Sequence, residues 1–288
     1  MFIATPEGMY NGTEINMKEY AIFLDIDGTL VGEKDFPLGG CVSAENIRAI
    51  NKARAAGHYV FLNTGRSYAW IQKAVIDELE VDGIISGIGT QILMHGKELY
   101  ECMIPTETLV NIYNAFSGTS RCVMFGGTEK IYVLNPSGFL DDPRFVFIRN
   151  EKDFFEKCLQ DKIQKCEVFE MSLAGGSVGI ETIISEVQLK ALTENLQNYS
   201  HTWYMESFPH GCTKSRAMLM TAEKIGISPK NTIAMGDSVN DADMLTAAGT
   251  GVAMGNAPEL VKEKADFVSR ACDENGVAYA IEKLLFNN

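Results

Sequence analysis

The sequence lacks the features that mark several classes of protein. Its seven cysteines are scattered, and no two stand at C-x-x-C spacing, so we expect neither a disulfide framework nor a zinc site. No apolar run approaches the roughly 18 residues that cross a bilayer. The opening residues carry no basic stretch followed by an apolar one, so no secretory signal is expected. A reducing cytoplasm fits these absences best.

Positive charge is also scarce. The formal net charge is −13, from 25 lysine and arginine residues against 38 aspartate and glutamate residues. Such a surface repels nucleic acid on average, so we expect no nucleic-acid partner. It repels a phosphorylated small molecule as well. Any phosphate site must therefore supply local positive charge from a metal ion, a lysine or backbone N–H groups.

Short apolar runs alternate with helical patterns at both ends of the chain. The runs at 20–24 and 59–63 predict strands buried on both faces, and further strands are predicted at 83–86, 232–235 and 251–254. Between the first two runs, 43–56 has apolar residues at helical spacing, with Ser43 as N-cap and Gly57 as the C′ glycine. This order predicts an α/β fold with a doubly wound parallel sheet.

The middle of the chain has a different pattern. Hairpins are predicted at 91–101, around His95-Gly96, and at 122–134, around Gly126-Gly127. Helices are predicted at 106–116, 151–158 and 186–198. Hairpins mixed with helices are typical of an α+β module, so we expect an inserted cap domain.

The domain boundaries follow from this change of pattern. Residues 1–16 are assigned to an N-terminal extension, 17–86 and 208–288 to the core, and 87–207 to the cap, each boundary good to about 2–4 residues. The glycines at 87–89 and 208–211 would then form either turns or the hinges of a lid.

Two acidic clusters directly follow predicted core strands, where an open α/β sheet places its site. Asp25 and Asp27 follow the first strand, and carboxylates two residues apart in extended chain point to the same side. The segment G-D-S-V-N-D follows the fourth core strand and contains Asp237, Asn240 and Asp241. Such oxygen ligands are typical of a hard-metal site. Each cluster alone is also compatible with a capped turn.

Two further clusters offer hydrogen-bond donors. Thr64, Gly65 and Arg66 follow the second strand, where a hydroxyl beside a helix start suits phosphate oxygens, although a plain helix cap explains them equally. Lys214 precedes a helix predicted at 215–225, and the helix dipole disfavours a positive charge there. Either Lys214 is a solvated surface lysine or another group holds it.

In this order, D-x-D-G-T, a hydroxyl residue, a lysine and G-D-x-x-N-D resemble the haloacid dehalogenase superfamily. The cap-sized insertion between Thr64 and Lys214 resembles that of its Cof-type hydrolases of subfamily IIB, as do the tail segments at 252–257 and 274–278. The chain departs from that pattern where Ser215 replaces the common glycine after the lysine. It departs again where G-I-G-T at 87–90 replaces the common Asn-Gly-Ala.

The resemblance implies a Mg²⁺-dependent phosphatase. It implies that Asp25 is the nucleophile, and that Asp27 protonates the leaving group and then activates water. Mg²⁺ would be held by the Asp25 side chain, the Asp27 carbonyl and Asp237. The resemblance assigns phosphate binding to Ile26, Thr64, Gly65, Lys214 and Asn240. Supporting roles fall to Arg66, Ser238 and Asp241.

The resemblance also implies a small phosphorylated metabolite as substrate, such as a sugar phosphate, pyridoxal phosphate or flavin mononucleotide. A hexose phosphomutase and a non-catalytic phosphate-binding regulatory protein are the alternatives. Retention of Asp25, Asp27, Lys214 and Asp237 argues against the second. Dependence on a bisphosphate activator would distinguish a mutase. The sequence defines neither the substrate nor the oligomeric state.

Overall fold

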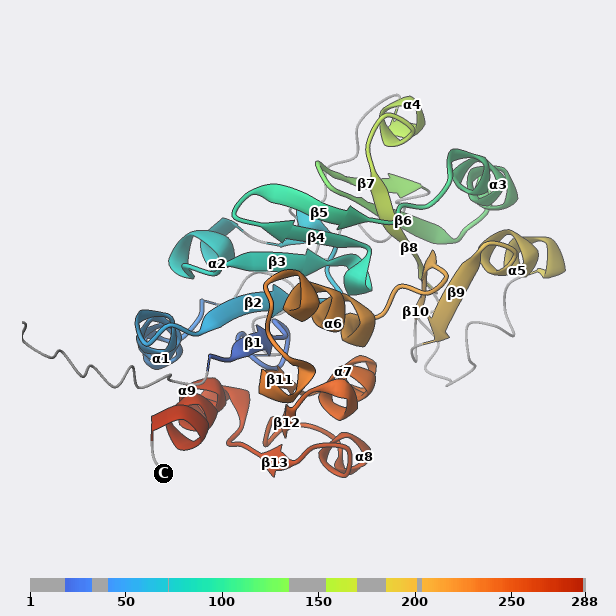
Figure 1. Ribbon diagram of the computed structural model, residues 1–288. Coiled ribbons are helices and arrows are strands. Elements are labelled where there is room, and N and C mark those ends of the chain that lie inside the picture. The colour runs from blue at the N-terminus through green and yellow to red at the C-terminus, as the bar shows by residue number, and fades with distance from the viewer. Residues whose placement is uncertain are drawn as a thin grey trace, which may run out of the picture.

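The computed structural model of the chain describes residues 19–32, 41–71, 73–134, 154–169, 185–200 and 204–286. These residues form two sheets, a larger one with helices on both faces and a smaller one beside it (Figure 1). Among them, no helix combines the length and the apolar character needed to cross a membrane.

The centre of the larger sheet is parallel. Its parallel strands are β1 (Ala21–Leu24), β2 (Tyr59–Asn63), β3 (Gly83–Ser86), β11 (Thr232–Gly236), β12 (Thr250–Ala253) and β13 (Phe267–Val268). They lie in the order β13-β12-β11-β1-β2-β3. All four residues of β1 are buried, which explains the unbroken apolar run, because a strand covered on both faces has no polar side. The predicted doubly wound α/β core is confirmed.

Helices cover both faces of this sheet. One face packs on α1 (Ala44–Ala55), α2 (Lys73–Glu78) and α9 (Gly276–Ile281), and the other on α6 (Lys214–Lys224), α7 (Ala242–Ala247) and α8 (Glu259–Lys262). Along β1, Ile22 and Leu24 face the first group, and Ala21 and Phe23 face the second, as the two-residue period of a strand requires. The carboxyl ends of the parallel strands therefore share one edge, which carries the polar loops.

The hairpin predicted at 91–101 forms, but it extends the larger sheet. Its strands are β4 (Gln91–Met94) and β5 (Lys97–Glu101), and β4 pairs antiparallel with β3. Assigning this segment to the cap was wrong, since the turn at 87–89 folds β4 back onto the edge of β3, whose backbone groups need partners. The glycines at 87–89 thus do not connect the core to the cap.

The smaller sheet is antiparallel and forms the cap. Its strands are β6 (Cys122–Gly127), β7 (Ile131–Leu134), β8 (Ile163–Phe169), β9 (Leu196–Ser200) and β10 (Tyr204–Pro209), in the order β7-β6-β8-β10-β9. Helices α3 (Thr106–Phe116), α4 (Phe154–Cys158) and α5 (Glu186–Thr193) cover one face. The other face packs on Trp70, from the loop after β2. The cap sheet therefore lies over the polar edge of the core.

Several helix predictions need adjustment. The helix predicted at 186–198 ends at Thr193, because Leu196–Ser200 gains backbone partners on β10 as β9. The segment 67–79 does not form one continuous helix, because η2 (Tyr68–Trp70) and α2 form separately there. The predicted extension at 1–16 and the start of the helix at 151–158 lie outside the described residues.

A buried aromatic pair tests the core. Phe23 and Phe61 stack with ring centroids 5.1 Å apart and are fully buried. We expect Phe61→Ala to lower the free energy of unfolding by about 3–5 kcal/mol, because it removes apolar contacts and leaves a cavity. Urea denaturation followed by circular dichroism measures this. Leu260→Ala, on an exposed position of α8, should change it by under about 0.5 kcal/mol; equal effects would contradict the packing argument.

Candidate active site

A tight turn shapes the loop after β1. The carbonyl of Ile26 accepts hydrogen bonds from the backbone N–H groups of Thr29, Leu30 and Val31. The N–H of Asp25 donates to the carbonyl of Met235 at 3.0 Å. Gly28 has a φ of +76°, and a Cβ there would lie 2.1 Å from Oδ2 of Asp237. Glycine thus lets the loops after β1 and β11 approach closely, which places Asp25 and Asp237 side by side.

Lys214 is buried and joins two acidic residues. Its Nζ donates to Oδ1 of Asp25 at 2.7 Å and to Oδ1 of Asp241 at 2.6 Å. Burial acts to lower the pKa of Lys214, but the carboxylates of Asp241 and Asp25 outweigh it, so the pKa is raised. The ammonium therefore stays charged at neutral pH. These two carboxylates also explain a lysine in the first turn of α6, against the helix dipole.

Asp25, Asp237 and Asp241 form a compact acidic cluster. One carboxylate oxygen from each lies within 4.8 Å of the others, and all three residues are buried. Burial raises the pKa of Asp25; Lys214 opposes this, and the carboxylates of Asp241 and Asp237 raise the pKa further. A further cation would relieve this repulsion, and carboxylate oxygens are the ligands that Mg²⁺ prefers. The donor set therefore fits a hard divalent cation.

The three carboxylates differ in their surroundings. Asp241 is fully enclosed, accepting from Lys214 through Oδ1 and from two backbone N–H groups of its own loop through Oδ2. Asp25 and Asp237 instead line a pocket. Asp241 thus orients Lys214 and the loop after β11, whereas Asp25 and Asp237 are the members open to a ligand.

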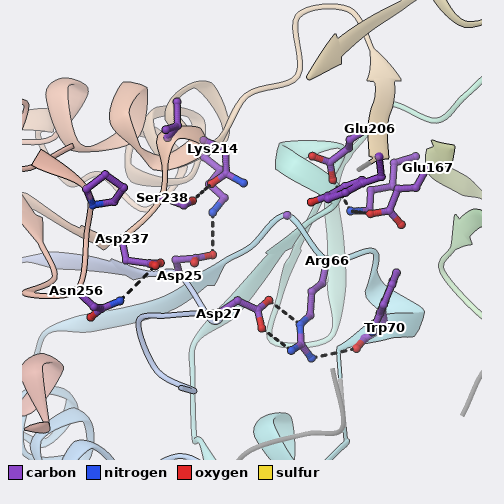
Figure 2. Close-up of a pocket in the computed structure, with 16 residues that line it drawn as sticks. Asp25, Asp27, Arg66, Trp70, Glu167, Glu206, Lys214, Asp237, Ser238 and Asn256 are labelled. Carbon is purple, nitrogen blue, oxygen red and sulfur yellow. Dashed lines mark hydrogen bonds and ion pairs between the residues drawn. The ribbon is translucent and has the colours of Figure 1, made fainter. Parts of the chain in front are cut away.

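Asp27 faces a different cation. Arg66 contacts both of its carboxylate oxygens, with Nε 2.8 Å from Oδ2 and Nη2 2.5 Å from Oδ1 (Figure 2). The guanidinium is buried, and its Nη1 donates to the carbonyl of Trp70 at 3.4 Å. Because a bidentate pair fixes both partners, the Asp27 carboxylate is held beside the loop after β2 and stands outside the acidic cluster.

The remaining predicted residues divide between the pocket wall and its support. Gly65, Ser238 and Asn240 line the pocket, and the Ser238 hydroxyl donates to Oδ1 of Asn240 at 2.6 Å. Thr64 is buried behind the wall, where its Oγ1 accepts from the backbone N–H two residues later at 3.1 Å. The fold therefore brings all four predicted polar clusters to one edge of the core sheet.

The cap supplies the opposite wall of the pocket, which has a volume of about 640 Å³. Figure 2 shows Glu167 and Glu206 across the cavity from Asp25 and Asp237. No function was predicted from the sequence for this wall, which comprises Lys165, Glu167, Tyr204 and Glu206 from the cap, with Trp70 from the loop after β2 beside them. Nor was a function predicted for Asn256, whose Nδ2 donates to the carbonyl of Gly28 at 2.9 Å and to Asp237 at 3.4 Å.

A detectable pattern marks the cap wall. In I-Q-K-C-E-V-F at 163–169, Lys165 and Glu167 stand two positions apart, and in Y-M-E-S-F-P at 204–209, Tyr204 and Glu206 do. Polar side chains at this spacing are typical of a strand with one polar face. This period could have predicted the two strands. It could not have predicted that their polar faces meet Asp25, since that depends on how the cap docks.

The arrangement suits displacement at an anionic centre. One buried carboxylate is fixed by an ammonium, a second carboxylate lies beside it in the acidic cluster, and a third is held at the pocket edge by a guanidinium. A nucleophile, compensating positive charge and a proton-transfer group are the requirements of such a reaction.

Comparison with known proteins agrees with this geometry. The family model for haloacid dehalogenase-like hydrolases matches residues 22–281. The chain is 29% identical over 294 residues to 5-amino-6-(5-phospho-D-ribitylamino)uracil phosphatase YwtE from Bacillus subtilis, covering 92% of this chain and 97% of that protein. A solved haloacid dehalogenase-like hydrolase from Bacteroides thetaiotaomicron is 28% identical, with a TM-score of 0.78 over 93% of this chain and all of that one.

A second solved structure of the same superfamily is also similar to this chain. The subclass IIB sugar phosphatase BT4131 is 25% identical, with a TM-score of 0.73 over 92% of this chain and 98% of that one. The family match spans both segments of the core and the cap between them. The chain therefore belongs to the haloacid dehalogenase-like hydrolases, as the order of its four motifs predicted.

Proposed function

We propose that the protein is a Mg²⁺-dependent phosphatase that hydrolyses a phosphate monoester of a small metabolite through a phosphorylated Asp25. One observation carries the proposal. Asp25 is held by Lys214 beside Asp237, on the wall of a pocket that the cap covers. Two of the relatives named above, YwtE and BT4131, are described as phosphatases, which supports the same reaction.

Asp25 supplies the attacking oxygen. Because Lys214 holds Oδ1, the carboxylate has a fixed orientation before substrate arrives. Attack forms a bond from the carboxylate oxygen to phosphorus while the bond from phosphorus to the leaving oxygen breaks. Water then attacks the phosphorus, releasing inorganic phosphate and restoring Asp25.

Asp27 transfers the protons. It would give a proton to the leaving oxygen in the first step and take one from water in the second. The bidentate contact with Arg66 fixes the orientation of this carboxylate at the pocket edge. In the first step, the leaving oxygen would take the place of one contact with Arg66.

The phosphate group would meet donors from several loops. Lys214 and Asn240 would donate from side chains, together with the Thr64 hydroxyl and the backbone N–H groups of Ile26 and Gly65. The buried ammonium of Lys214 offsets the repulsion expected from a chain of net charge −13. A phosphate therefore encounters local positive charge despite the acidic surface.

The side chains of Asp25 and Asp237, with the carbonyl of Asp27, would hold Mg²⁺. When bound, the ion neutralises charge between the nucleophile and the phosphate. Asp241 stays with Lys214 and the backbone of its loop. Its supporting role is thus distinct from metal binding.

The volume of the pocket and the substrates of the relatives limit the class of substrate that we propose. About 640 Å³ suits a small metabolite, since such sites span roughly 300–1,000 Å³. The named relatives act on a sugar phosphate and on a phosphoribitylaminouracil, and we propose a substrate of that kind. The intact Asp25, Lys214 and Asp237 set disfavours a non-catalytic regulator. No described feature specifically favours a phosphomutase.

Replacing the nucleophile should abolish turnover. Asp25→Asn keeps the shape but removes the attacking charge, so kcat with p-nitrophenyl phosphate should fall by at least about 10³-fold. Asp77→Asn, at an exposed position of α2, is the matched control and should retain activity. Retention of more than about a tenth of the activity by Asp25→Asn would show that another group attacks.

Replacing the proton carrier should depend on the leaving group. Asp27→Asn should reduce hydrolysis of alkyl phosphates by about 10²–10⁴-fold, because an alkoxide needs protonation as it leaves. The loss should be smaller for p-nitrophenyl phosphate, whose leaving group needs little acid help. Rates for a series of esters with different leaving-group pKa test this. An equal loss across the series would argue against Asp27 as the acid.

Removing the metal should stop the reaction. EDTA should abolish activity and Mg²⁺ restore it, whereas Ca²⁺ should inhibit because its looser coordination disturbs the in-line geometry. Isothermal titration calorimetry should show that Asp237→Ala weakens Mg²⁺ binding, while Asp273→Ala, at an exposed position, leaves it unchanged. Full activity after exhaustive chelation would refute the proposed mechanism.

A further inference from the structure

The cap wall places two carboxylates directly opposite each other. In the antiparallel pairing of β8 with β10, Glu206 is the partner of Glu167, and Tyr204 is the partner of Phe169. Lys165 lies two residues before Glu167 on the same strand, and all three charged side chains line the pocket. We call Lys165, Glu167 and Glu206 the cap trio.

The cap trio is an unfavourable arrangement for stability alone. Like charges directly opposite on neighbouring strands destabilise a sheet, and all three side chains are about 95% buried. Lys165 relieves part of the repulsion by donating to Glu167 at 3.1 Å and to Glu206. Burial acts to lower the pKa of Lys165, but the two carboxylates outweigh it and raise the pKa. The trio thus combines two carboxyl groups with one ammonium group, a formal net charge of −1.

The position of the trio indicates which part of a substrate it would contact. A phosphate bound at Asp25 would direct its ester group toward the cap, because the trio lines the far side of the same pocket (Figure 2). Ionised carboxylates only accept hydrogen bonds. They favour a ligand with hydroxyl donors, whereas a second anionic group would approach a buried, net negative wall.

We propose that the cap trio selects the leaving group: it binds the hydroxyls of a neutral, polyhydroxylated leaving group and rejects one that carries a second anionic charge. Tyr204, stacked on Phe169 with centroids 5.4 Å apart, adds an apolar surface for the C–H faces of such a group. The proposal rests on the proposed phosphatase function, and it assigns specificity to Glu167, Glu206 and Lys165.

Two compounds of matched length test the proposal. Sorbitol 6-phosphate and 6-phosphogluconate differ at C1, where a hydroxymethyl group replaces a carboxylate. Their inhibition constants are measured by competition against p-nitrophenyl phosphate. Sorbitol 6-phosphate should bind at least about tenfold more tightly, since like-charge contacts in a buried site are strongly unfavourable. Equal constants, or no competition by sorbitol 6-phosphate, would overturn the proposal.

Variants test whether the trio causes the difference between the two inhibition constants. Glu206→Gln keeps the side-chain shape and makes the trio neutral, so the ratio of the two constants should fall toward about one. Glu101→Gln is the matched control, because Glu101 is exposed and pairs with Lys162 outside the pocket, and it should keep the native ratio. An unchanged ratio in Glu206→Gln would remove the trio from this role.

Two controls separate a failure of the trio proposal from misfolding of the variant and from a failure of the phosphatase proposal. Circular dichroism checks that Glu206→Gln folds, and Glu167→Gln provides the same charge change from β8 if it does not. Absence of p-nitrophenyl phosphate hydrolysis by the native protein would refute the phosphatase proposal instead. Calorimetric dissociation constants for the same two compounds would then still test whether the trio discriminates by charge.

Discussion

Lys214 donates to two buried carboxylates that come from distant parts of the chain, and the polar edge of the core depends on this contact. Asp25 follows β1, Asp241 lies in the loop after β11, and Lys214 begins α6. The Asn63 side chain, at the end of β2, donates to the backbone carbonyl of Lys214 at 3.0 Å. Removing one partner of a buried ion pair typically costs about 3–5 kcal/mol. The interaction therefore joins three loops and orients the proposed nucleophile.

The same edge shows how backbone conformation and charge cooperate. Gly28 allows the loops after β1 and β11 to approach each other. Nδ2 of Asn256, in the loop after β12, donates to the carbonyl of Gly28 at 2.9 Å. Close approach brings Asp25 and Asp237 together, which raises the repulsion between them. The negative charge of these carboxylates is balanced in part by Lys214. In our proposal, Mg²⁺ balances the rest.

The cap also places buried carboxylates and a lysine on its wall of the pocket. Its sheet uses one face to pack α3, α4 and α5, and turns the other toward the core. Buried carboxylates on that face are unfavourable for folding, so we attribute them to ligand selection. The core edge would thus supply the reaction and the cap would supply the choice of substrate.

The sequence by itself determined the parallel core, the order of its polar loops and the residues at the reactive edge. Apolar runs reveal buried strands, and parallel strands place the loops that follow them at one edge. Only the tertiary structure decided that the hairpin at 91–101 joins the core sheet, that Arg66 holds Asp27, and that Glu167 and Glu206 face Asp25. These features depend on strand partners and on docking between segments far apart in the chain. Local periodicity reports which face of a strand is polar, but not what that face meets.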